Sequence, residues 1–365
     1  QRALADDALL LDYLIHDRGL HVIAVTRARL AAAIQLVPEA RLGRLVHSLL
    51  FSLRGAAWTS RDARPADRAL DEELTLLAAA ALWPALPHGT ALDRLRTLAV
   101  VPVAPLARLP WAALPLPDGR ALCESLELTV VPGLRLGLAR ARRSEPGGRP
   151  LVVAADAGEL ASVESETRAI LRLFPDTTLL AGNEATAARF LALAPAADWI
   201  HFAGHGHYRA EAPHESGLRF ADRWLLAGEL ADVGLAARWV TLSACQSARA
   251  LVRPGEEWFG LARALLLSGA RAVVAAQWDI EDAAAAALME DLYGRMSHGE
   301  GLGQALAGAQ AARRHAGVHP VEWAGFVMLA GPEAGRAGIG RRGTPRPEPS
   351  RTRSPRPVGN GRMPR

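Results

Sequence analysis

The sequence predicts an α/β protein built on a mostly parallel sheet that helices cover on both faces, preceded by a further α/β half. Three observations support this fold class. Over residues 151–331, short apolar runs alternate with longer amphipathic segments, as they do when helices connect parallel strands. Residues 142–150, rich in glycine, proline and charge, are typical of a linker. With 50% apolar and 22% charged residues, most of the chain is expected to fold.

The first half, residues 1–141, is expected to hold a hairpin, two helices and two more strands. In chain order these elements are predicted at 8–15, 20–26, 37–53, 66–82, 98–103 and 126–131. The two runs of the hairpin are separated by Asp17-Arg-Gly, a turn sequence. Both helices show apolar residues at helical spacing, and a proline precedes the second. Reactive residues do not converge in this half, so its role is expected to be structural.

The second half, residues 151–331, alternates strands with helices. Strands are predicted at 151–154, 178–180, 199–202, 239–243, 272–276 and 326–329, and helices at 164–174, 185–193, 258–268, 281–296 and 303–314. Parallel strands need crossover connections, which these helices supply. Ligands of such a sheet bind beyond the carboxyl ends of its strands. The residues that follow the strands are therefore the candidates for function.

Two residues that follow predicted strands carry the chemistry. His205 ends the segment Trp199-Ile-His-Phe-Ala-Gly-His, and Cys245 ends Trp239-Val-Thr-Leu-Ser-Ala-Cys, forty positions later. The fold can therefore bring an imidazole and a thiol together over one sheet edge. A thiol nucleophile with an imidazole base is the minimum equipment of a cysteine protease. The backbone amides of Gly206 and Cys245 would then form the oxyanion hole.

Other interpretations of the histidines and cysteines stay open. His205, His207 and Cys245 are three potential zinc ligands, although no fourth ligand stands at a usual spacing. His201 lies inside a predicted strand and is expected to be a packed or hydrogen-bonded histidine. Cys123 has no histidine or glycine motif beside it and is expected to be inert core.

The basic character of the chain belongs to its tail, residues 332–365. Nine arginines against one acid, Glu348, give residues 336–365 a charge of +8, so the overall +4 leaves about −4 on the rest. Residues 336–365 also carry six prolines and no hydrophobic periodicity, and we expect the tail to be disordered. Nucleic acid is therefore not an expected partner, except weakly through this tail.

Cysteine usage and hydropathy favour the cytoplasm. Two cysteines are too few for a disulfide framework, and no charged-then-apolar signal segment opens the sequence. No apolar run reaches the roughly 18 uncharged residues that a membrane span needs. We expect a cytoplasmic protein that does not cross a membrane.

The segments around His205 and Cys245 resemble those of the CHAT domain, a caspase-like peptidase module that is related to separases and often follows tetratricopeptide repeats. The resemblance covers nearly all of residues 3–331. Its specific parts are His201-Phe-Ala-Gly-His-Gly, Thr241-Leu-Ser-Ala-Cys-Gln-Ser, and Gly269-Ala-Arg-Ala-Val-Val-Ala-Ala-Gln-Trp followed by Asp282. It implies that His205 is the catalytic histidine, that Cys245 is the nucleophile, and that the first half is a degenerate caspase-like domain.

The resemblance also bears on the substrate pocket. Ser243 stands where the wider caspase signature has a glutamine, and relatives that cut after basic residues place an acid near the cysteine. Ser243, Asp279 and Asp282 are therefore candidate pocket residues. Asp279, Glu281 and Asp282 would equally cap the helix predicted at 281–296, and capping is the favoured interpretation.

CHAT peptidases resemble effectors of bacterial defence and signalling that a sensor module or partner holds inactive. The expected partners are thus a protein or peptide substrate and a regulatory sensor or repeat module, and neither a cofactor nor a metal is implied. No period near 34 residues recurs in this sequence, so a repeat array would have to lie upstream or on a separate partner. The alternative from another functional class is a non-catalytic, caspase-like interaction module.

Overall fold

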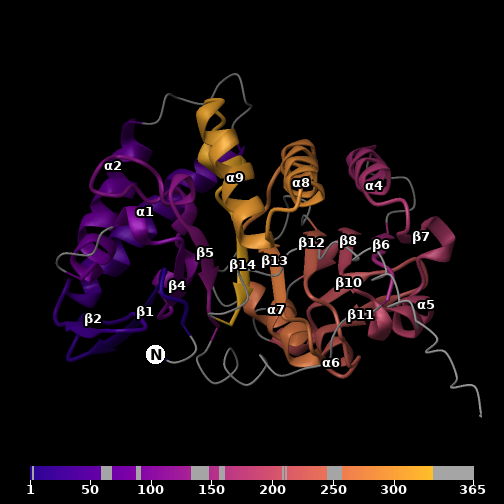
Figure 1. The fold of residues 1–365 in the computed structure, drawn as a ribbon, viewed down its shortest axis with the longest axis horizontal. Coiled ribbons are helices and arrows are strands. Elements are labelled where there is room, and N and C mark those ends of the chain that lie inside the picture. Colours follow the sequence, from indigo (N-terminus) through magenta and orange to yellow (C-terminus); the bar gives the residue numbers. More distant parts are fainter. Residues whose placement is uncertain are drawn as a thin grey trace, which may run out of the picture.

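A continuous sheet of eleven strands runs through the part of the chain that the structure describes (Figure 1). This computed structural model describes residues 1, 4–58, 68–87, 92–132, 148–155, 161–207, 209, 212–244 and 257–331. The strand order is β3-β2-β1-β4-β5-β14-β13-β12-β8-β6-β7. The bounds of these strands are β1 (Ala8–His16), β2 (Gly19–Val25), β3 (Leu30–Ala33), β4 (Thr97–Val101), β5 (Glu127–Val130), β6 (Leu151–Ala154), β7 (Thr178–Ala181), β8 (Ile200–Gly204), β12 (Val240–Ala244), β13 (Ala272–Ala276) and β14 (Phe326–Ala330).

Helices cover both faces of this sheet. The α-helices of the described residues are α1 (Glu39–Trp58), α2 (Arg68–Leu77), α4 (Ala161–Leu173), α5 (Ala187–Leu193), α6 (Ala227–Ala231), α7 (Glu257–Ser268), α8 (Asp282–Ser297) and α9 (Leu302–His315). In Figure 1, α4, α8 and α9 form a row above the strands, whereas α5, α6 and α7 lie below them. The predicted fold class, a mostly parallel sheet with helices on both faces, is confirmed.

The second half contributes the parallel part of the sheet that surrounds the predicted site. Strands β13, β12, β8, β6 and β7 are parallel to one another, and β14 runs antiparallel to β13. Every residue of β6, β8 and β13 is buried. Strands buried on both faces are continuous apolar runs in the sequence. This explains why all the predicted strands and helices of this half are present, with bounds that differ by three residues or fewer.

The first half begins with the predicted hairpin, β1 and β2, in which His16 is paired with Gly19. The two turn residues, Asp17 and Arg18, have φ angles of 47° and 59°. A two-residue turn with both central residues in this region matches the twist of the flanking strands. The predicted helices are also present as α1 and α2, and α2 continues as a π-helical turn over Ala78–Leu82.

The sequence did not predict β3 or a second, three-stranded sheet. Three of the four residues of β3 are alanines, which have a low strand propensity, and the strand is largely exposed. The second sheet consists of β9 (Gly206–His207), β10 (Gly217–Arg219) and β11 (Trp224–Leu226). Strands of two or three residues are too short to show a period of two. This small sheet follows β8 directly and so adjoins the predicted site.

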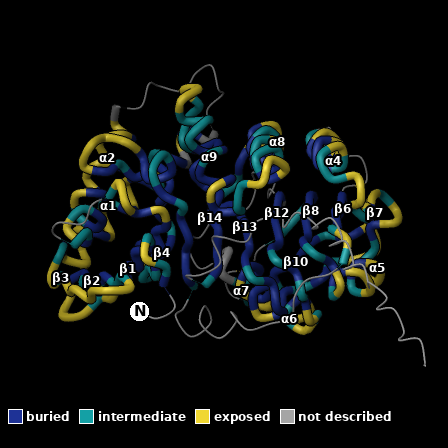
Figure 2. The backbone as a smooth tube through the Cα atoms, in the orientation of Figure 1, coloured by how far each residue is buried: buried dark blue, intermediate teal, exposed yellow. Residues whose placement is uncertain are grey.

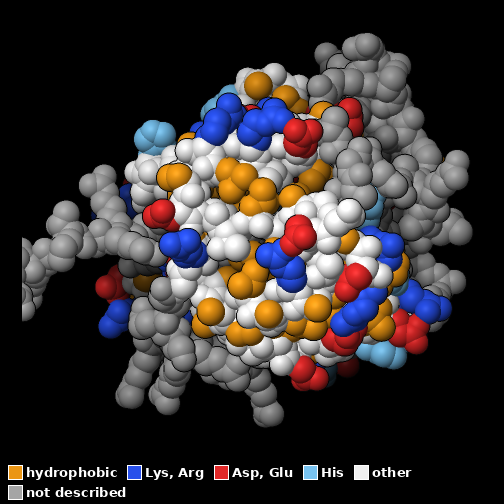
Figure 3. All heavy atoms as spheres, turned by 90° about the vertical axis from the view of Figure 1, so that its right-hand side faces the viewer, with side chains coloured by type: hydrophobic (Ala, Val, Ile, Leu, Met, Phe, Trp, Pro, Cys, Tyr) orange, Lys and Arg blue, Asp and Glu red, His pale blue; other side chains and the backbone are white. Residues whose placement is uncertain are grey.

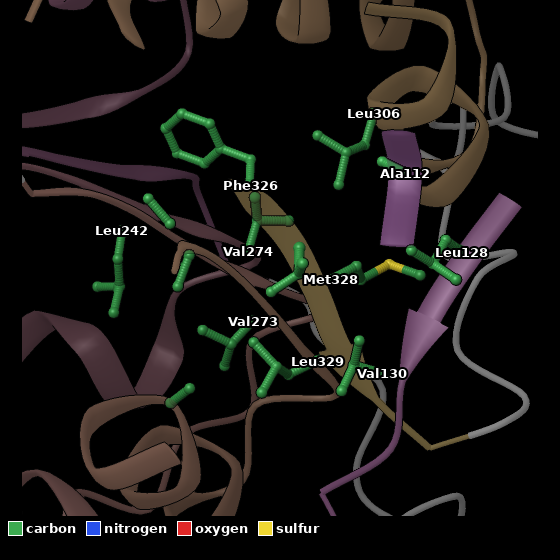
Figure 4. Close-up of a cluster of buried hydrophobic side chains, with 14 of the residues drawn as sticks. Ala112, Leu128, Val130, Leu242, Val273, Val274, Leu306, Phe326, Met328 and Leu329 are labelled. Atoms are coloured by element: carbon green, nitrogen blue, oxygen red, sulfur yellow. The ribbon is translucent and has the colours of Figure 1, made fainter. Parts of the chain in front are cut away.

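The two halves meet along β5 and β14, which are parallel, with Val130 paired to Leu329. Figure 4 shows side chains of both strands packed together at this junction, including Leu128 from β5 and Met328 from β14. The largest cluster of buried apolar side chains includes residues of both halves. The halves therefore share one core as well as one sheet.

Burial follows the position of a strand in the sheet. Figure 2 shows the central strands in dark blue, whereas exposed residues gather at the end formed by β1, β2 and β3 and on the outer sides of the helices. On the face shown in Figure 3, side chains of both charge signs are mixed.

Within the described ranges, no helix is long and apolar enough to cross a membrane. Most of the predicted linker, 142–150, and the whole predicted tail, 332–365, lie outside the described residues.

Candidate active site

The strands that precede His205 and Cys245 lie side by side. β8 and β12 are parallel, and each residue of β8 is paired with the residue forty positions later, up to Gly204 with Ala244. The separation of the two motifs in the sequence is thus also the register offset of the two strands. His205 and Cys245 are the next residues along the chain. Cys245 itself lies outside the described residues, so the dyad stays a prediction.

His205 lies in a tightly constrained bend between β8 and β9. Gly204 has a φ of +155°, and a Cβ atom there would lie 3.3 Å from the Cβ of Ala155. Both the backbone angle and the close approach favour glycine at this position. The carbonyl oxygen of His205 accepts a hydrogen bond from the backbone N–H of Arg219 at 2.8 Å. The small sheet therefore fixes the backbone of the half-buried His205 at the carboxyl end of β8.

Gly206 and His207 belong to this small sheet. Gly206 is paired with Leu218 in β10. The ring of His207 packs edge-on against Trp224, with centroids 4.3 Å apart, and its buried Nδ1 atom has no hydrogen-bond partner among the residues that the structure describes. Among the described residues, no three histidine, cysteine, aspartate or glutamate side chains lie close enough to hold a metal ion. The zinc interpretation includes Cys245, which is outside that part of the chain.

A set of buried polar side chains lies directly behind the ends of β8 and β12. Ser243 donates a hydrogen bond to Glu166 Oε2 at 2.9 Å, and the other carboxylate oxygen, Oε1, lies 3.0 Å from His201 Nε2. His201 Nδ1 lies 3.1 Å from the hydroxyl of Tyr293, which donates to Thr241 Oγ1 at 3.0 Å. The prediction that His201 is a packed, hydrogen-bonded histidine is confirmed, since its side chain is wholly buried.

Glu166 and Tyr293 were not singled out from the sequence. A signal for Glu166 does exist, because it lies three positions after Val163 and four before Ile170, both of which are on the buried face of α4. A carboxylate on the apolar face of an amphipathic helix requires a partner inside the protein. Nothing comparable distinguishes Tyr293, which lies in the alanine-rich helix α8.

The amino ends of the same two strands are anchored by aromatic rings and an ion pair. Trp199 and Trp239 stack with an interplanar angle of 9° and centroids 5.6 Å apart. One residue earlier, Arg238 Nε donates to Asp198 Oδ1 at 2.8 Å. These contacts join residues that are again forty positions apart. Along β8 and β12, an aromatic anchor, a buried polar set and the candidate dyad therefore follow one another.

The acids proposed for the pocket follow β13, the neighbour of β12. Because β12 and β13 are parallel, the chain after β13 leaves the sheet at the same edge as His205. Glu281 is the N-cap residue of α8 but makes no capping hydrogen bond through its side chain, and Asp282 lies in the first turn. A carboxylate in the first turn of a helix interacts favourably with the helix dipole. Asp279 lies between β13 and this helix.

The end of β13 is fastened to both halves. Gln277 Nε2 donates to the carbonyl oxygen of Ala107 in the first half at 2.8 Å. The indole N–H of Trp278 donates to the carbonyl oxygen of Val321, also at 2.8 Å. A Cβ atom on Gly325 would lie 2.7 Å from the Trp278 indole, so the glycine leaves room for the ring. These contacts fix the chain just before Asp279.

Cys123 is an inert thiol, as the sequence predicts. It is buried in the first half, and burial, the largest influence, raises its pKa to about 12. A thiol with so high a pKa has almost no thiolate at neutral pH. Cys123 therefore does not compete as a nucleophile.

Comparison with protein families identifies a match. The model of the family described as "CHAT domain" matches residues 71–332, which include both predicted catalytic segments. A search of curated proteins found no match.

Solved structures with a similar fold include two crystal structures of the Saccharomyces cerevisiae separase–securin complex. They match with TM-scores of 0.54 and 0.58 and sequence identities of 12% and 11%. Each match covers 90% of this chain and 30% of the matched chain in the complex. Gingipain R, an Arg-specific cysteine proteinase of Porphyromonas gingivalis, matches at 11% identity with a TM-score of 0.48 over 82% of this chain and 76% of its own. At such identities the separase match indicates a shared fold alone, in agreement with the predicted caspase-like fold. The present chain spans about 30% of the length of the separase chain.

Proposed function

This chain belongs to the CHAT domain family, and from that premise we propose that it is a cysteine endopeptidase whose catalytic dyad is His205 and Cys245. The observation that carries this proposal is the register of β8 and β12, in which Gly204 is paired with Ala244. Consecutive Cα atoms are about 3.8 Å apart across a trans peptide. The peptide bond therefore limits how far the Cα atom of Cys245 can lie from that of Ala244, and so supports a thiol near His205.

In the proposed reaction, His205 accepts the proton of the Cys245 thiol, and the thiolate attacks the carbonyl carbon of a peptide bond. The backbone N–H groups of Gly206 and Cys245 donate hydrogen bonds to the oxyanion that forms. The imidazolium of His205 then gives its proton to the departing amine, which leaves an acyl-enzyme thioester. Water, deprotonated by the same imidazole, hydrolyses the thioester and restores the thiol.

The substrate is a protein or peptide, and the proposed pocket is built from Ser243, Asp279 and Asp282. The hydroxyl of Ser243 is already committed to Glu166, so it is not a free donor for a substrate side chain. The two aspartates would then give the pocket its charge, and a basic or polar substrate residue would fit it best. Cleavage of a peptide library by the wild-type chain and by Asp279→Asn tests this assignment.

The biological setting belongs to the same proposal. We infer a cytoplasmic effector of bacterial defence or signalling that is controlled by an upstream sensor, a repeat module or a separate partner protein. The separase structures support control by a partner only by analogy, because in both of them separase is in complex with securin. Cleavage assays with and without candidate partner proteins test this part.

The decisive experiment is the rate of Cys245 alkylation as a function of pH, in the wild-type chain and in His205→Ala. A free thiol has a pKa of about 8.5. We expect the wild-type thiol to titrate well below that value and the His205→Ala profile to move toward it. A Cys245→Ala chain, which retains only the buried Cys123, measures the background.

If Cys245 is alkylated slowly, and at the same rate in the wild type and in His205→Ala, the proposed dyad is contradicted. Partner binding that survives Cys245→Ala, in a chain without cleavage activity, would then favour the non-catalytic interaction module instead.

A further inference from the structure

Five buried polar side chains close a circuit across the two strands of the proposed site. Starting at β12, the circuit runs from Ser243 to Glu166 on α4, to His201 on β8, to Tyr293 on α8 and back to Thr241 on β12. Thr241 and Ser243 are two residues apart on one strand, so their side chains point to the same face. We call these five residues the buried ring. None of them is more than 6% exposed.

The hydrogen-bond directions assign the protons of the buried ring. Burial, the largest influence, raises the pKa of Tyr293, so its hydroxyl stays protonated and donates to Thr241. The oxygen of Tyr293 is then the acceptor for the Nδ1–H of His201. Nε2 of His201 lies 3.0 Å from Glu166 Oε1, and within the described part of the chain neither atom makes an aligned hydrogen bond. The carboxylate and the imidazole are thus in direct contact inside the core.

The buried ring lies next to the residues that would do the chemistry. His201 is four positions before His205 on β8, and Ser243 is two positions before Cys245 on β12. His201 and Thr241 are paired in the register of the two strands. The ring therefore connects β8 to β12 through side chains, in addition to the backbone hydrogen bonds of the sheet.

An apolar core would stabilise these strands at least as well. Replacing a buried ion pair by apolar residues of similar volume is often neutral or stabilising. Apolar packing is non-directional, whereas each contact of the ring fixes an angle and a distance. The buried ring, which is costly to desolvate and lies immediately behind the proposed site, is thus better explained by a role in orienting β8 and β12 than by a gain in stability.

We propose that the buried ring is a positioning device, in which Glu166, His201 and Tyr293 hold the carboxyl ends of β8 and β12 so that His205 and Cys245 meet. This inference rests on the proposed function. It assigns no direct contact with substrate to Glu166, His201 or Tyr293. It predicts that breaking the ring uncouples the thiol from the imidazole while the chain stays folded.

The test uses two tyrosines of the full chain, each of which is buried and donates a hydrogen bond through its hydroxyl. Tyr293→Phe removes one oxygen from the ring, and Tyr13→Phe removes one from the first half, where the hydroxyl donates to the carbonyl oxygen of Ala81 at 2.8 Å. The measurement is the pH profile of Cys245 alkylation, each variant being made with and without His205→Ala. Glu166→Gln, which keeps the shape of the side chain, is the second ring variant.

We expect Tyr13→Phe to keep the wild-type profile. Tyr293→Phe and Glu166→Gln should raise the thiol pKa by about one unit, which slows labelling about tenfold at pH values well below that pKa. In those two backgrounds, adding His205→Ala should change little further, because the coupling is already lost. Circular dichroism and a cooperative thermal transition establish that each variant is folded.

Three results would overturn the inference. Ring variants that melt earlier but keep the wild-type profile would show that the ring only stabilises. A shift of equal size in Tyr13→Phe would show general loosening. If His205→Ala does not change the pH profile of Cys245 alkylation in the otherwise wild-type chain, the proposed dyad is wrong and this inference fails with it. That outcome is seen without any ring variant. If Glu166→Gln does not fold, Tyr293→Phe, which deletes a single oxygen, decides alone.

Discussion

The two halves of this molecule share one sheet and one core, yet they bury different chemistry. With tyrosine, tryptophan and cysteine counted as apolar, the buried polar residues described in the first half are two threonines, Thr97 and Thr129. In the second half they are Glu166, Thr167, His201, Ser216, Thr241, Ser243, Ser268, Gln310 and Glu322. Burying polar and charged groups is costly unless they are paired. The difference shows that the second half depends more on directional contacts, and that one of its two buried carboxylates, Glu166, lies beside the proposed site.

The largest effect is expected from Glu166→Ala. This change leaves His201 buried without its partner, and breaking a buried ion pair costs about 3–5 kcal/mol. The matched control is Glu164→Ala on the same helix, where an exposed pair with Arg168 is lost and the cost should stay below about 1 kcal/mol. The free energy of unfolding in urea measures both.

If Glu166→Ala lowers the free energy of unfolding by less than about 1 kcal/mol, the contrast between the two halves is lost, because the buried pair then behaves like a surface pair. A double variant, Glu166→Leu with His201→Leu, tests the same contrast more sharply. We expect that double variant to recover much of the stability but not the labelling rate of Cys245.

The next effect concerns two glycines, one from each half. Gly204→Ala forces a side chain into a φ of +155° next to Ala155 and should cost about 1–3 kcal/mol. Gly43 lies exposed within α1, where an added Cβ atom would meet only open space, and Gly43→Ala should stabilise by up to about 1 kcal/mol. Thermal unfolding compares the two. Equal and small effects would mean that the bend before His205 is not constrained by its backbone.

The smallest effect concerns Glu124, which joins the halves by accepting contacts from Arg314 Nε at 2.9 Å and His315 Nε2 at 2.6 Å. Burial, the largest single influence, raises the pKa of Glu124, but the N–H of Ala121, His315 and Arg314 together bring it below its ordinary value of 4.5. A lowered folded-state pKa adds stability above the unfolded value, and this stability is lost as the pH falls through the folded value.

Glu124→Gln should therefore melt at a lower temperature than the wild type at neutral pH. The loss in free energy of unfolding should stay under about 1 kcal/mol, because both partners of Glu124 are partly exposed. The gap between the two melting temperatures should close as the pH falls below about 4.5. Melting curves from pH 3 to pH 7, roughly the window of this titration, supply the check. A gap that is constant over this range would show that the carboxylate charge does not contribute.

The strands and helices of the second half could be predicted closely because the apolar pattern of their residues follows their burial in the fold. Val152 and Val273, for example, lie in runs that are apolar throughout, as doubly covered strands must be. The alanines of β3 and the short strands around Trp224 carry no such pattern. Strand order is also invisible in the sequence, since no residue of β14 shows that its neighbours are β5 and β13.

Prediction of the site had a similar limit. The motifs predicted that His205 follows a strand, and the forty-residue separation became meaningful once the register of β8 and β12 was known. Glu166 could be found only through its place on the apolar face of α4, and Tyr293 only through its contacts. Side chains that act on a site from other elements depend on tertiary packing, which periodicity does not encode.

The position of β14 has a consequence for how the protein is made. It is the last strand of the described residues, yet it lies in the middle of the sheet, between β5 and β13. A ribosome therefore releases both flanks of the sheet before the strand that joins them, and contacts such as Val130 with Leu329 close a loop of slightly more than half of the chain. Contacts so distant in sequence form late and slowly. The nascent chain would thus reach its joined form only once β14 has emerged, long after β8 and β12.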